Sequence, residues 1–474
     1  MKPILTLSFL ILFSVKIFPQ SNSIPEDRWQ MVGQFLNQQK DGSAFFMVGS
    51  GGKIMFTKGL GYADREQKIP FDDQTLFSIG SITKPFTATA ILLLMEKGKL
   101  DPKDPITKYF DNVPEDKKGI TLHQLLTHSS GLPGAIADDY EIISAEDFQK
   151  KVWSTPLQFT PGQGYSYSNV GYSLLGMIIE KVSGQTYSAF LEKNIFQPAG
   201  MTTAGYANPK ADYHKLAHGY FQDGSDWGTM KDKKWDGDEP SWNLKANGGI
   251  LMSATDLYKW YLALRNNTIL KPETLKLQTT PHVKEGEMDS YYGYGYSVML
   301  NGEVVQHNGG NRIFKADFRW FPKSDMFLIS VSNDPGVRLF LLNDQIMDIL
   351  NTGKMPETIN WTSFPLEKFP ADPMQETAKK FIDLLQNYSV EARKKFVLEY
   401  FTADIQTRNT PEHLQNLFEM LSNDIGQGPV EKIETTDQGL QLTMPAQEGR
   451  AHLKIRLFFK ENKIDRIGAE MEGM

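Results

Sequence analysis

The chain has 474 residues, of which 40% are hydrophobic, and this length predicts roughly two or three domains with a sizeable core. Its formal net charge of −7 makes nucleic acids and anionic membrane surfaces poor partners. The chain has no cysteine, which excludes disulfide bonds and a lipid attached to a cysteine.

The first predicted element is a secretory signal peptide over residues 1–20. Lys2 precedes an apolar run, residues 4–13, that is too short to span a bilayer comfortably. Removal of the peptide would take away Lys2 and Lys16 and change the net charge from −7 to −9. We therefore expect a secreted or periplasmic protein without stable membrane insertion. The alternative is an N-terminal membrane anchor, because the residues before Ser21 do not form a clean small-x-small cleavage site.

Two S-x-x-K patterns follow, and their surroundings differ. Ser50 lies among glycines between two β-like runs, which predicts a hairpin turn. Ser81 precedes an apolar run, residues 88–97, that ends at Gly98 and predicts a buried helix. Positions i and i+3 of such a helix share one face, so the Lys84 ammonium can lie beside the Ser81 hydroxyl. Ser81 is therefore the candidate nucleophile.

The Y-x-N pattern also occurs twice. Tyr167-Ser168-Asn169 follows Pro161-Gly162 and precedes an apolar run, whereas Tyr206-Ala207-Asn208 has no such flanks and is predicted to be a loop. His128 is interpreted as a structural residue that holds a loop through hydrogen bonds. The acidic stretch between Asp223 and Glu239 lacks the spacing of a calcium site and is predicted to be a solvated loop.

The third motif is His307-Asn308-Gly309-Gly310, which follows a predicted strand. Glycines at this place would leave the backbone bare, so that a substrate can lie along the strand edge. Together the motifs of Ser81, Tyr167 and His307 contain a nucleophile, candidate bases, an orienting amide and a glycine-flanked oxyanion donor. This set is what acyl transfer through a serine ester requires.

The last part of the chain changes character. An apolar helix is predicted over residues 337–350, and the proline-bearing stretch 354–372 is predicted to be a linker. Residues 373–474 contain three helical patterns and then an alternating strand pattern at 451–459, which predict a small α+β module. This module has no nucleophile or metal-ligand spacing, and its default role is structural or substrate-gating.

In this order and with these flanks, the motifs resemble those of the serine β-lactamase/penicillin-binding-protein superfamily. The resemblance is to the branch of class C β-lactamases, DD-peptidases, D-aminopeptidases and related esterases, and it covers most of residues 25–350. Besides the three motifs it includes the stretches Gly80–Ala88, Leu125–Leu132, Gly171–Gly176, Asn247–Ile250 and Tyr292–Gly295. It implies an α+β fold for residues 24–353, with a mostly antiparallel sheet flanked by helices and a helical region inserted between Lys84 and Tyr167.

The resemblance also implies roles for individual residues. Ser81, Lys84 and Tyr167 would form a coupled catalytic unit in which either Lys84 or Tyr167 is the base, and the Lys84 ammonium should ease loss of the Tyr167 proton. Asn169 would bind the acyl amide of a substrate and hold Lys84. The oxyanion hole would consist of the backbone N–H groups of Ser81 and Gly310. The further substrate contacts would come from His307, Asn308 and Gly309.

The third motif departs from the Lys-Thr-Gly of many β-lactamases. His307 replaces a fixed charge by one expected to titrate near neutrality, so that carboxylate-bearing substrates would lose binding as the pH rises. Asn308 replaces a hydroxyl that helps to bind a substrate carboxylate. Both changes weaken the case for a dedicated β-lactamase, although Arg312 could restore a cation nearby.

The sequence thus predicts an exported serine hydrolase that cleaves an amide or ester of a small molecule or short peptide through an acyl-enzyme on Ser81. No metal or organic cofactor is implied. The alternatives are a DD-carboxypeptidase or D-aminopeptidase acting on cell-wall peptides, and a penicillin-binding sensor that is acylated without turnover. The oligomeric state stays open.

Overall fold

The computed structural model describes residues 24–39, 42–206, 208–221, 224–233, 235, 237–285, 290–311, 313–334, 337, 339–355, 373–386, 390–408, 418, 421, 432–436, 439–445 and 451–473. The predicted signal peptide, most of the predicted linker and Arg312 lie outside the described residues. The described residues divide into two compact units, one ending at Leu339 and the other beginning at Phe340. This division falls in the first turn of the apolar helix that the sequence analysis placed in the first domain, up to residue 353.

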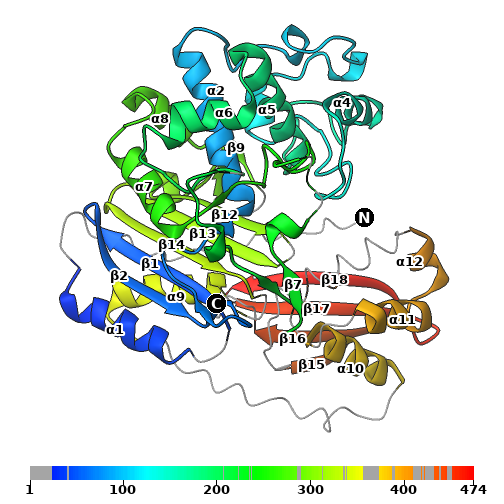
Figure 1. Ribbon diagram of the computed structural model, residues 1–474. Helices are drawn as coiled ribbons and strands as arrows, with labels where there is room; N and C mark the ends of the chain where they lie inside the picture. The colour runs from blue at the N-terminus through cyan, green and yellow to red at the C-terminus, as the bar shows by residue number, and fades with distance from the viewer. Residues whose placement is uncertain are drawn as a thin grey trace. The chain divides into compact units, whose positions relative to one another are not determined.

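The first unit contains an eight-stranded antiparallel sheet with the strand order β2-β1-β14-β13-β12-β11-β10-β9 (Figure 1). Its strands are β1 (Ala44–Ser50), β2 (Lys53–Leu60), β9 (Val283–Lys284), β10 (Ser290–Tyr292), β11 (Ser297–Met299), β12 (Val304–Asn311), β13 (Phe314–Phe321) and β14 (Met326–Ser332). Every residue of β14 is buried, as expected for a central strand, while the edge strand β2 exposes several of its side chains. β1 pairs with β14 from Ala44↔Ser332 to Ser50↔Met326, which joins the two ends of this unit.

The β1–β2 hairpin confirms the interpretation of Ser50 as a turn residue. Ser50 pairs with Lys53, and the two residues between them are Gly51 and Gly52, with φ of 63° and 73°. Positive φ at both central positions is what a two-residue hairpin turn requires, and glycine adopts it without steric cost. The second S-x-x-K pattern therefore has a backbone explanation.

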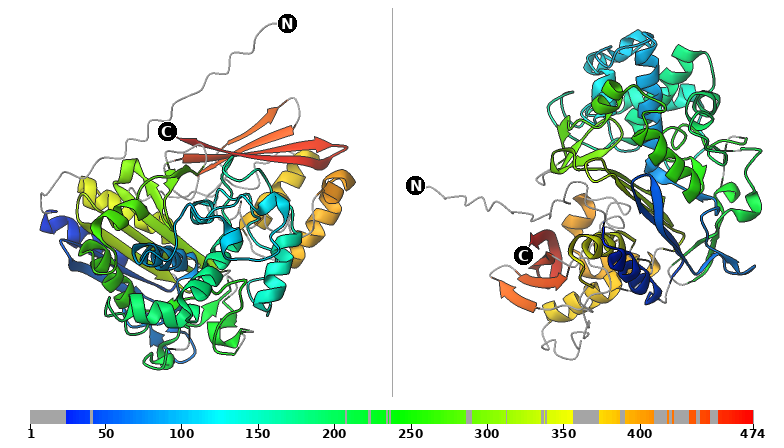
Figure 2. Two further views of the ribbon diagram at one scale, coloured as in Figure 1. Left: turned by 90° about the horizontal axis from the view of Figure 1, so that it is seen from above. Right: turned by 90° about the vertical axis from the view of Figure 1, so that its left-hand side faces the viewer.

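The helices of this unit lie on both faces of the large sheet (Figures 1 and 2). α1 packs against β2 on one face, and the helices around α2 gather on the other. Their bounds are α1 (Glu26–Asn37), α2 (Thr83–Glu96), α3 (Leu122–Leu126), α4 (Ala145–Ser154), α5 (Asn169–Ser183), α6 (Tyr187–Leu191), α7 (Ala254–Arg265) and α8 (Pro272–Gln278). Short strand pairs complete the unit: β3 (Tyr62–Asp64) with β4 (Ile69–Pro70), β5 (Phe77–Ser78) with β8 (Leu251–Met252), and β6 (Gly219–Tyr220) with β7 (Asp226–Gly228).

α2 forms the centre of the helical layer, as its apolar sequence predicts. Its side chains from Thr83 to Leu94 are buried, and the helix contacts α5 and α8. It ends before Gly98, whose φ of 65° is the left-handed conformation typical of a helix stop. Because buried neighbours surround α2, its first turn has a fixed position relative to the sheet.

The second unit is an α+β module with its own core. α9 (Leu339–Thr352) begins it, and helices α10 (Pro373–Gln386), α11 (Val390–Tyr400) and α12 (Ala403–Arg408) precede an antiparallel sheet. The sheet has the order β15-β16-β17-β18, with β15 (Lys432–Thr436), β16 (Gly439–Pro445), β17 (Ala451–Lys460) and β18 (Lys463–Gly473). α10 and α11 match two of the predicted helical patterns, and β17 matches the alternating pattern at 451–459. The third helical pattern falls almost entirely outside the described residues.

Across the described ranges, we find no helix with both the length and the apolar character needed to cross a membrane.

Candidate active site

The candidate nucleophile lies on a tight turn between a short strand and a helix. β5 leads into the 3-10 turn Gly80–Ile82, and α2 follows directly, so the partly exposed Ser81 lies just before the first turn of α2. Gly80 has a φ of 50°, and a Cβ on it would lie 2.5 Å from the backbone nitrogen of Gly310. Only glycine allows the turn to approach β12 this closely.

Gly309, on β12, also allows the nucleophile turn and the strand to lie this close together. A Cβ on Gly309 would lie 1.9 Å from the carbonyl oxygen of Ile79 and 3.2 Å from the backbone nitrogen of Ser81. The sequence analysis explained this glycine by substrate access, but the structure shows that it is needed to seat the nucleophile turn on the sheet. A Cβ on Gly310 would meet only the Phe314 carbonyl oxygen, at 3.8 Å, so the space at that position is open.

The part of β12 that carries the third motif, His307 to Gly310, pairs with a strand on one side only among the described residues. β11 pairs with β12 from Met299↔Val304 to Ser297↔Gln306, whereas β13 pairs with it up to Asn311. Within the described part of the chain, Gly309 and Gly310 therefore have β13 as their only partner strand. The N–H and C=O groups on the other edge face the nucleophile turn, where an extended substrate could add as a further strand.

Lys84 lies beside Ser81, as the i, i+3 spacing predicts. Its Nζ donates to Ser81 Oγ at 3.1 Å and to the carbonyl oxygen of Asn247 at 2.8 Å, and the residue is 0% exposed. Burial lowers the pKa of Lys84 well below its usual value, and the carboxylate of Asp139 opposes this shift only in part. A buried amine of lowered pKa can accept the Ser81 proton near neutral pH.

Tyr167 places its ring beside the same amine. The distance from Lys84 Nζ to the Tyr167 ring centroid is 4.7 Å, and to that of Tyr172 it is 5.7 Å. Burial raises the pKa of Tyr167, and the neighbouring Ser81 hydroxyl opposes this only in part. The expectation that the Lys84 ammonium eases loss of the phenolic proton is therefore wrong: desolvation is the larger effect. These pKa directions favour Lys84 as the base and Tyr167 as a proton donor.

Asn169 begins α5 and is fixed by its backbone. Its N–H donates to the carbonyl oxygen of Gly134 at 2.9 Å, and the preceding Ser168 caps the helix by accepting from Gly171 N at 3.1 Å. The Oδ1 atom of Asn169 is buried and has no hydrogen-bond partner among the described residues. An unsatisfied buried acceptor of this kind fits a group that receives an N–H from a substrate.

The structure corrects one role of Asn169. The sequence analysis expected this side chain to hold Lys84, but the second hydrogen bond of Lys84 goes to the Asn247 carbonyl, and none to Asn169 occurs among the described residues. Asn247 is in turn fixed by bonds from its Nδ2 to Ser173 Oγ at 3.0 Å and to the Asn243 carbonyl at 2.8 Å. The only sequence signal for Asn247 was the stretch Asn247–Ile250, to which no role was assigned.

His128 has the structural role that the sequence predicted. Its Nδ1 accepts from the N–H of Ser168 at 3.0 Å, and its carbonyl oxygen accepts from Ser166 N at 2.9 Å. Its ring is fully buried, with its centroid 4.2 Å from that of Tyr167 and 4.4 Å from that of Tyr292. Burial lowers the pKa of His128 well below its usual value, so the ring is neutral. This neutral ring packs against Tyr167 and holds the backbone of Ser168. Tyr206, from the second Y-x-N pattern, is also structural: it lies in a loop, and its hydroxyl donates to the carbonyl oxygen of Lys245.

His307 is buried and neutral, which overturns the expectation that it titrates near neutrality. The residue is 4% exposed, its Nδ1–H donates to the carbonyl oxygen of Asn308 at 2.5 Å, and its Nε2 accepts from the Tyr292 hydroxyl at 3.0 Å. Burial, with the nearby Lys84 charge as a second cause, lowers the pKa of His307 to about 3. Asn308 is exposed and points to the opposite side of the strand, as alternation requires.

We therefore predict that His307 contributes no titration to activity between about pH 5 and about pH 8. The pH profiles of kcat/KM for one anionic and one neutral substrate should be parallel in this range, and His307→Gln should keep them parallel. An apparent pKa seen only with the anionic substrate would contradict this prediction.

The lowered pKa of His307 should affect stability instead. The histidine has a pKa near 6.5 in the unfolded chain and about 3 in the folded protein, so below pH 6.5 the unfolded chain binds the extra proton. The unfolding free energy should therefore fall as the pH is lowered from 6.5 toward 3.

The assembled site thus has a serine beside an amine of lowered pKa, a buried phenol, an unsatisfied amide oxygen and a free strand edge. Such an arrangement can activate a hydroxyl, receive an extended substrate and stabilise an oxyanion through backbone N–H groups. Among the described residues there is no group of three or more His, Asp or Glu side chains that could hold a metal ion.

Comparison with known proteins gives consistent matches. The Beta-lactamase family model matches residues 30–351. PbpX of Bacillus subtilis (strain 168) is 35% identical over 331 residues, covering 69% of this chain and 79% of its own length. Penicillin-binding protein 4* of the same organism is 29% identical over 299 residues, covering 59% and 66%.

Solved structures agree on the fold. A penicillin-binding protein from Bacillus halodurans is 30% identical with a TM-score of 0.55, covering 65% of this chain and 94% of its own. A D-amino acid amidase from Ochrobactrum anthropi SV3 is 26% identical with a TM-score of 0.53, covering 65% and 90%. A penicillin-binding protein homologue from Pyrococcus abyssi, 22% identical with a TM-score of 0.60, shares the fold over 94% of this chain and 99% of its own.

Proposed function

Since this chain belongs to the Beta-lactamase family of serine hydrolases, we propose that it cleaves an amide or ester bond through an acyl-enzyme on Ser81. The observation that carries the proposal is the 3.1 Å hydrogen bond between Lys84 Nζ and Ser81 Oγ. A serine hydroxyl is a weak nucleophile until a base takes its proton, and a buried lysine of lowered pKa is such a base. No other serine of an S-x-x-K pattern in this chain lies at the start of a buried helix.

In the first half-reaction, Lys84 takes the Ser81 proton while Oγ attacks the substrate carbonyl. The oxyanion would accept from the N–H groups of Ser81 and Gly310, the first on the nucleophile turn and the second on the strand that this turn contacts. The Lys84–Tyr167 pair then returns a proton to the leaving amine or alcohol, and the carbon–heteroatom bond breaks. Water repeats the sequence on the acyl-enzyme, with Lys84 again as the base.

Substrate positioning follows from the free strand edge and the second motif. The backbone of Gly309 and Gly310 would bind an extended substrate as an added strand, beside a neutral His307 whose two ring nitrogens are bonded to Asn308 and Tyr292. Asn169 Oδ1 would accept the N–H of an acyl amide. Asn308, which is exposed beside this edge, would contact the more distant part of the substrate.

A neutral His307 disfavours a dedicated β-lactamase, because that substrate class is anchored through its carboxylate. The second candidate is therefore a peptidase or amidase that acts on D-amino acid derivatives such as cell-wall peptides. The D-amino acid amidase of Ochrobactrum anthropi, which is similar to this chain, gives independent support for that substrate class. A sensor that is acylated without turnover is the third candidate.

Export to the cell surface or periplasm is proposed from residues 1–20, whose basic start and apolar core are typical of signal peptides. The expected substrates are small molecules or short peptides.

For residues 373–474 we propose a structural or substrate-gating role, since the sequence offers no second set of catalytic groups there.

The test is to incubate the purified protein with a fluorescent penicillin, D-amino acid amides and peptides, and short-chain esters. Turnover of an amide or ester with an adduct on Ser81 is the expected result. Label that persists without turnover of any compound supports the sensor, and the absence of both label and turnover defeats the proposal.

A further inference from the structure

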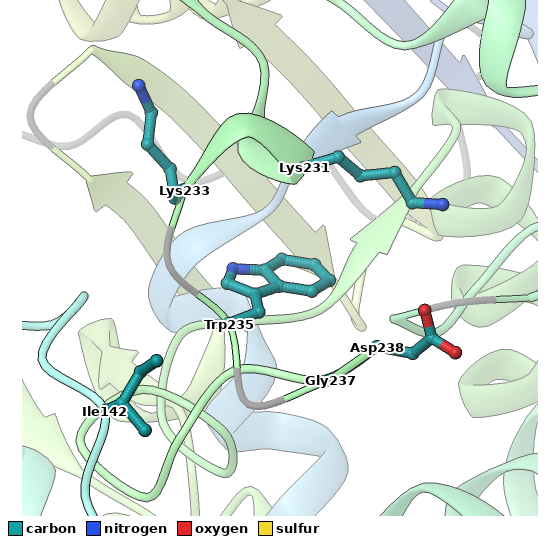
Figure 3. Close-up of a pocket in the computed structure, with 6 residues that line it drawn as sticks. All are labelled: Ile142, Lys231, Lys233, Trp235, Gly237 and Asp238. Atoms are coloured by element: carbon teal, nitrogen blue, oxygen red, sulfur yellow. The ribbon is translucent and has the colours of Figure 1, made fainter.

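A cavity of about 340 Å³ is lined by six residues that lie outside the catalytic motifs (Figure 3). Its walls come from two segments that are far apart in the sequence. Ile142 belongs to the segment between α3 and α4, and the other lining residues lie within or after the 3-10 turn Met230–Asp232. These residues are Lys231, Lys233, Trp235, Gly237 and Asp238.

The same two segments contact residues of the catalytic site. In the segment of Ile142, the carbonyl oxygen of Gly134 accepts a hydrogen bond from the N–H of Asn169 at 2.9 Å. The following loop continues to Asn247, whose carbonyl holds Lys84 at 2.8 Å. The segments are tied to each other by the Glu141 carbonyl, which accepts from Asn243 Nδ2 at 3.0 Å.

A further contact links the segment that contains Lys231 to β12. Met230, next to Lys231, places its sulfur 3.2 Å from Nδ2 of Asn311, the residue after Gly310. Asn311 Nδ2 also donates to Ser78 Oγ at 2.8 Å, three residues before the nucleophile. The segments that line the cavity are therefore bonded to Asn169, to Lys84 and to the residue after Gly310.

Its lining combines an apolar surface with positive charge. Trp235 lies in the centre of the cavity and Ile142, which is 52% exposed, lies to one side of it (Figure 3). The indole Nε1 of Trp235 is buried and has no hydrogen-bond partner among the described residues. Two lysines and one aspartate among the lining residues leave a net charge of +1.

The two lysines differ in their availability. Lys233 Nζ donates to the Trp227 carbonyl at 2.6 Å and lies 3.3 Å from the ring centroid of Trp227. Lys231 Nζ lies over the Tyr213 ring, 3.6 Å from its centroid, and forms no ion pair within the described residues. A cation on an aromatic face keeps the capacity to donate hydrogen bonds to an anion.

We propose that this cavity binds a carboxylate-bearing apolar group of the substrate, with Lys231 as the cationic partner and Trp235 and Ile142 as the apolar surface. The inference rests on the proposed function and names the substrate class of that same site. Since His307 is neutral, the third motif does not supply the fixed charge that an anionic substituent needs. Lys231 supplies it instead.

Binding is tested on the Ser81→Ala protein, so that the result does not depend on turnover. Calorimetry compares two amides that differ only in a para substituent, a 4-carboxybenzoyl amide and the corresponding methyl ester. We expect the carboxylate to bind about tenfold more tightly, and Lys231→Gln to remove this preference while leaving the ester within about twofold. Lys276→Gln, which changes an exposed lysine on α8 outside the cavity, should preserve the preference.

Equal binding of the two amides, or a preference that survives Lys231→Gln, would overturn the inference. A preference for a cationic amine in place of the carboxylate would also overturn it and would assign the cavity to Asp238. Loss of turnover by the wild-type protein on every amide and ester would instead refute the proposed function, so the two failures are distinguishable.

Discussion

Ser81→Ala is expected to abolish both covalent labelling by a fluorescent penicillin and hydrolysis of every substrate, while the protein stays folded. The hydroxyl is the atom that forms the acyl bond, and its loss leaves only binding and the oxyanion hole, so the rate should fall by roughly 10⁴-fold or more. The side chain is partly exposed and accepts a hydrogen bond from Lys84, and its removal should change the melting temperature little.

Ser50→Ala is the matched control, because Ser50 belongs to the second S-x-x-K pattern but lies in the β1–β2 hairpin. It should change neither labelling nor turnover. Mass spectrometry of the trapped adduct decides the assignment: a penicilloyl mass on any peptide that lacks Ser81 would be incompatible with it.

Lys84→Met and Tyr167→Phe are each expected to lower kcat by several orders of magnitude, roughly 10³-fold or more, with a double mutant little worse than either single variant. The reason is that the amine and the phenol lie against each other, 4.7 Å between Nζ and the ring centroid, and handle one proton together. Losses that multiply in the double mutant would show that the two residues act independently.

The pH dependence of the wild type separates their roles. Because burial lowers the pKa of Lys84 well below 10.5, its neutral form persists toward neutral pH. Activity should therefore be lost as the pH falls through this lowered pKa, and Tyr167→Phe should keep that acidic limb at reduced amplitude. If the acidic limb disappears in Tyr167→Phe but survives in Lys84→Met, the phenol and not the amine is the base.

Several features of the fold could be predicted because they depend on neighbours in the sequence. The apolar run after Ser81 forms α2 and ends before Gly98, and the glycines after Ser50 form a hairpin turn, since backbone conformation at these places follows from the residue type. The alternating pattern at 451–459 forms β17 for the same reason. The order of the three motifs also indicated the family, since their joint occurrence is far more specific than each motif alone.

The protonation states could not be read from residue types. Tyr167 and His307 were both expected to ionise more readily than they do, because sequence shows the charged neighbour but not the burial of the group. Desolvation disfavours the charged form of each, and its size depends on packing by segments far away in the chain. Acid and base roles for Lys84 and Tyr167 could therefore be proposed only from their burial.

What the sequence by itself determined was the chemical inventory: a serine and a lysine one helical turn apart, a tyrosine, an asparagine, and glycines at the end of a strand. What only the tertiary structure decided was how these groups meet. The Asn247 carbonyl that holds Lys84 lies 163 positions away from it, and Gly80 and Gly309 matter because two distant segments touch where neither has room for a Cβ. Local pattern fixes residue types and elements, whereas packing between distant segments fixes distances, burial and hence reactivity.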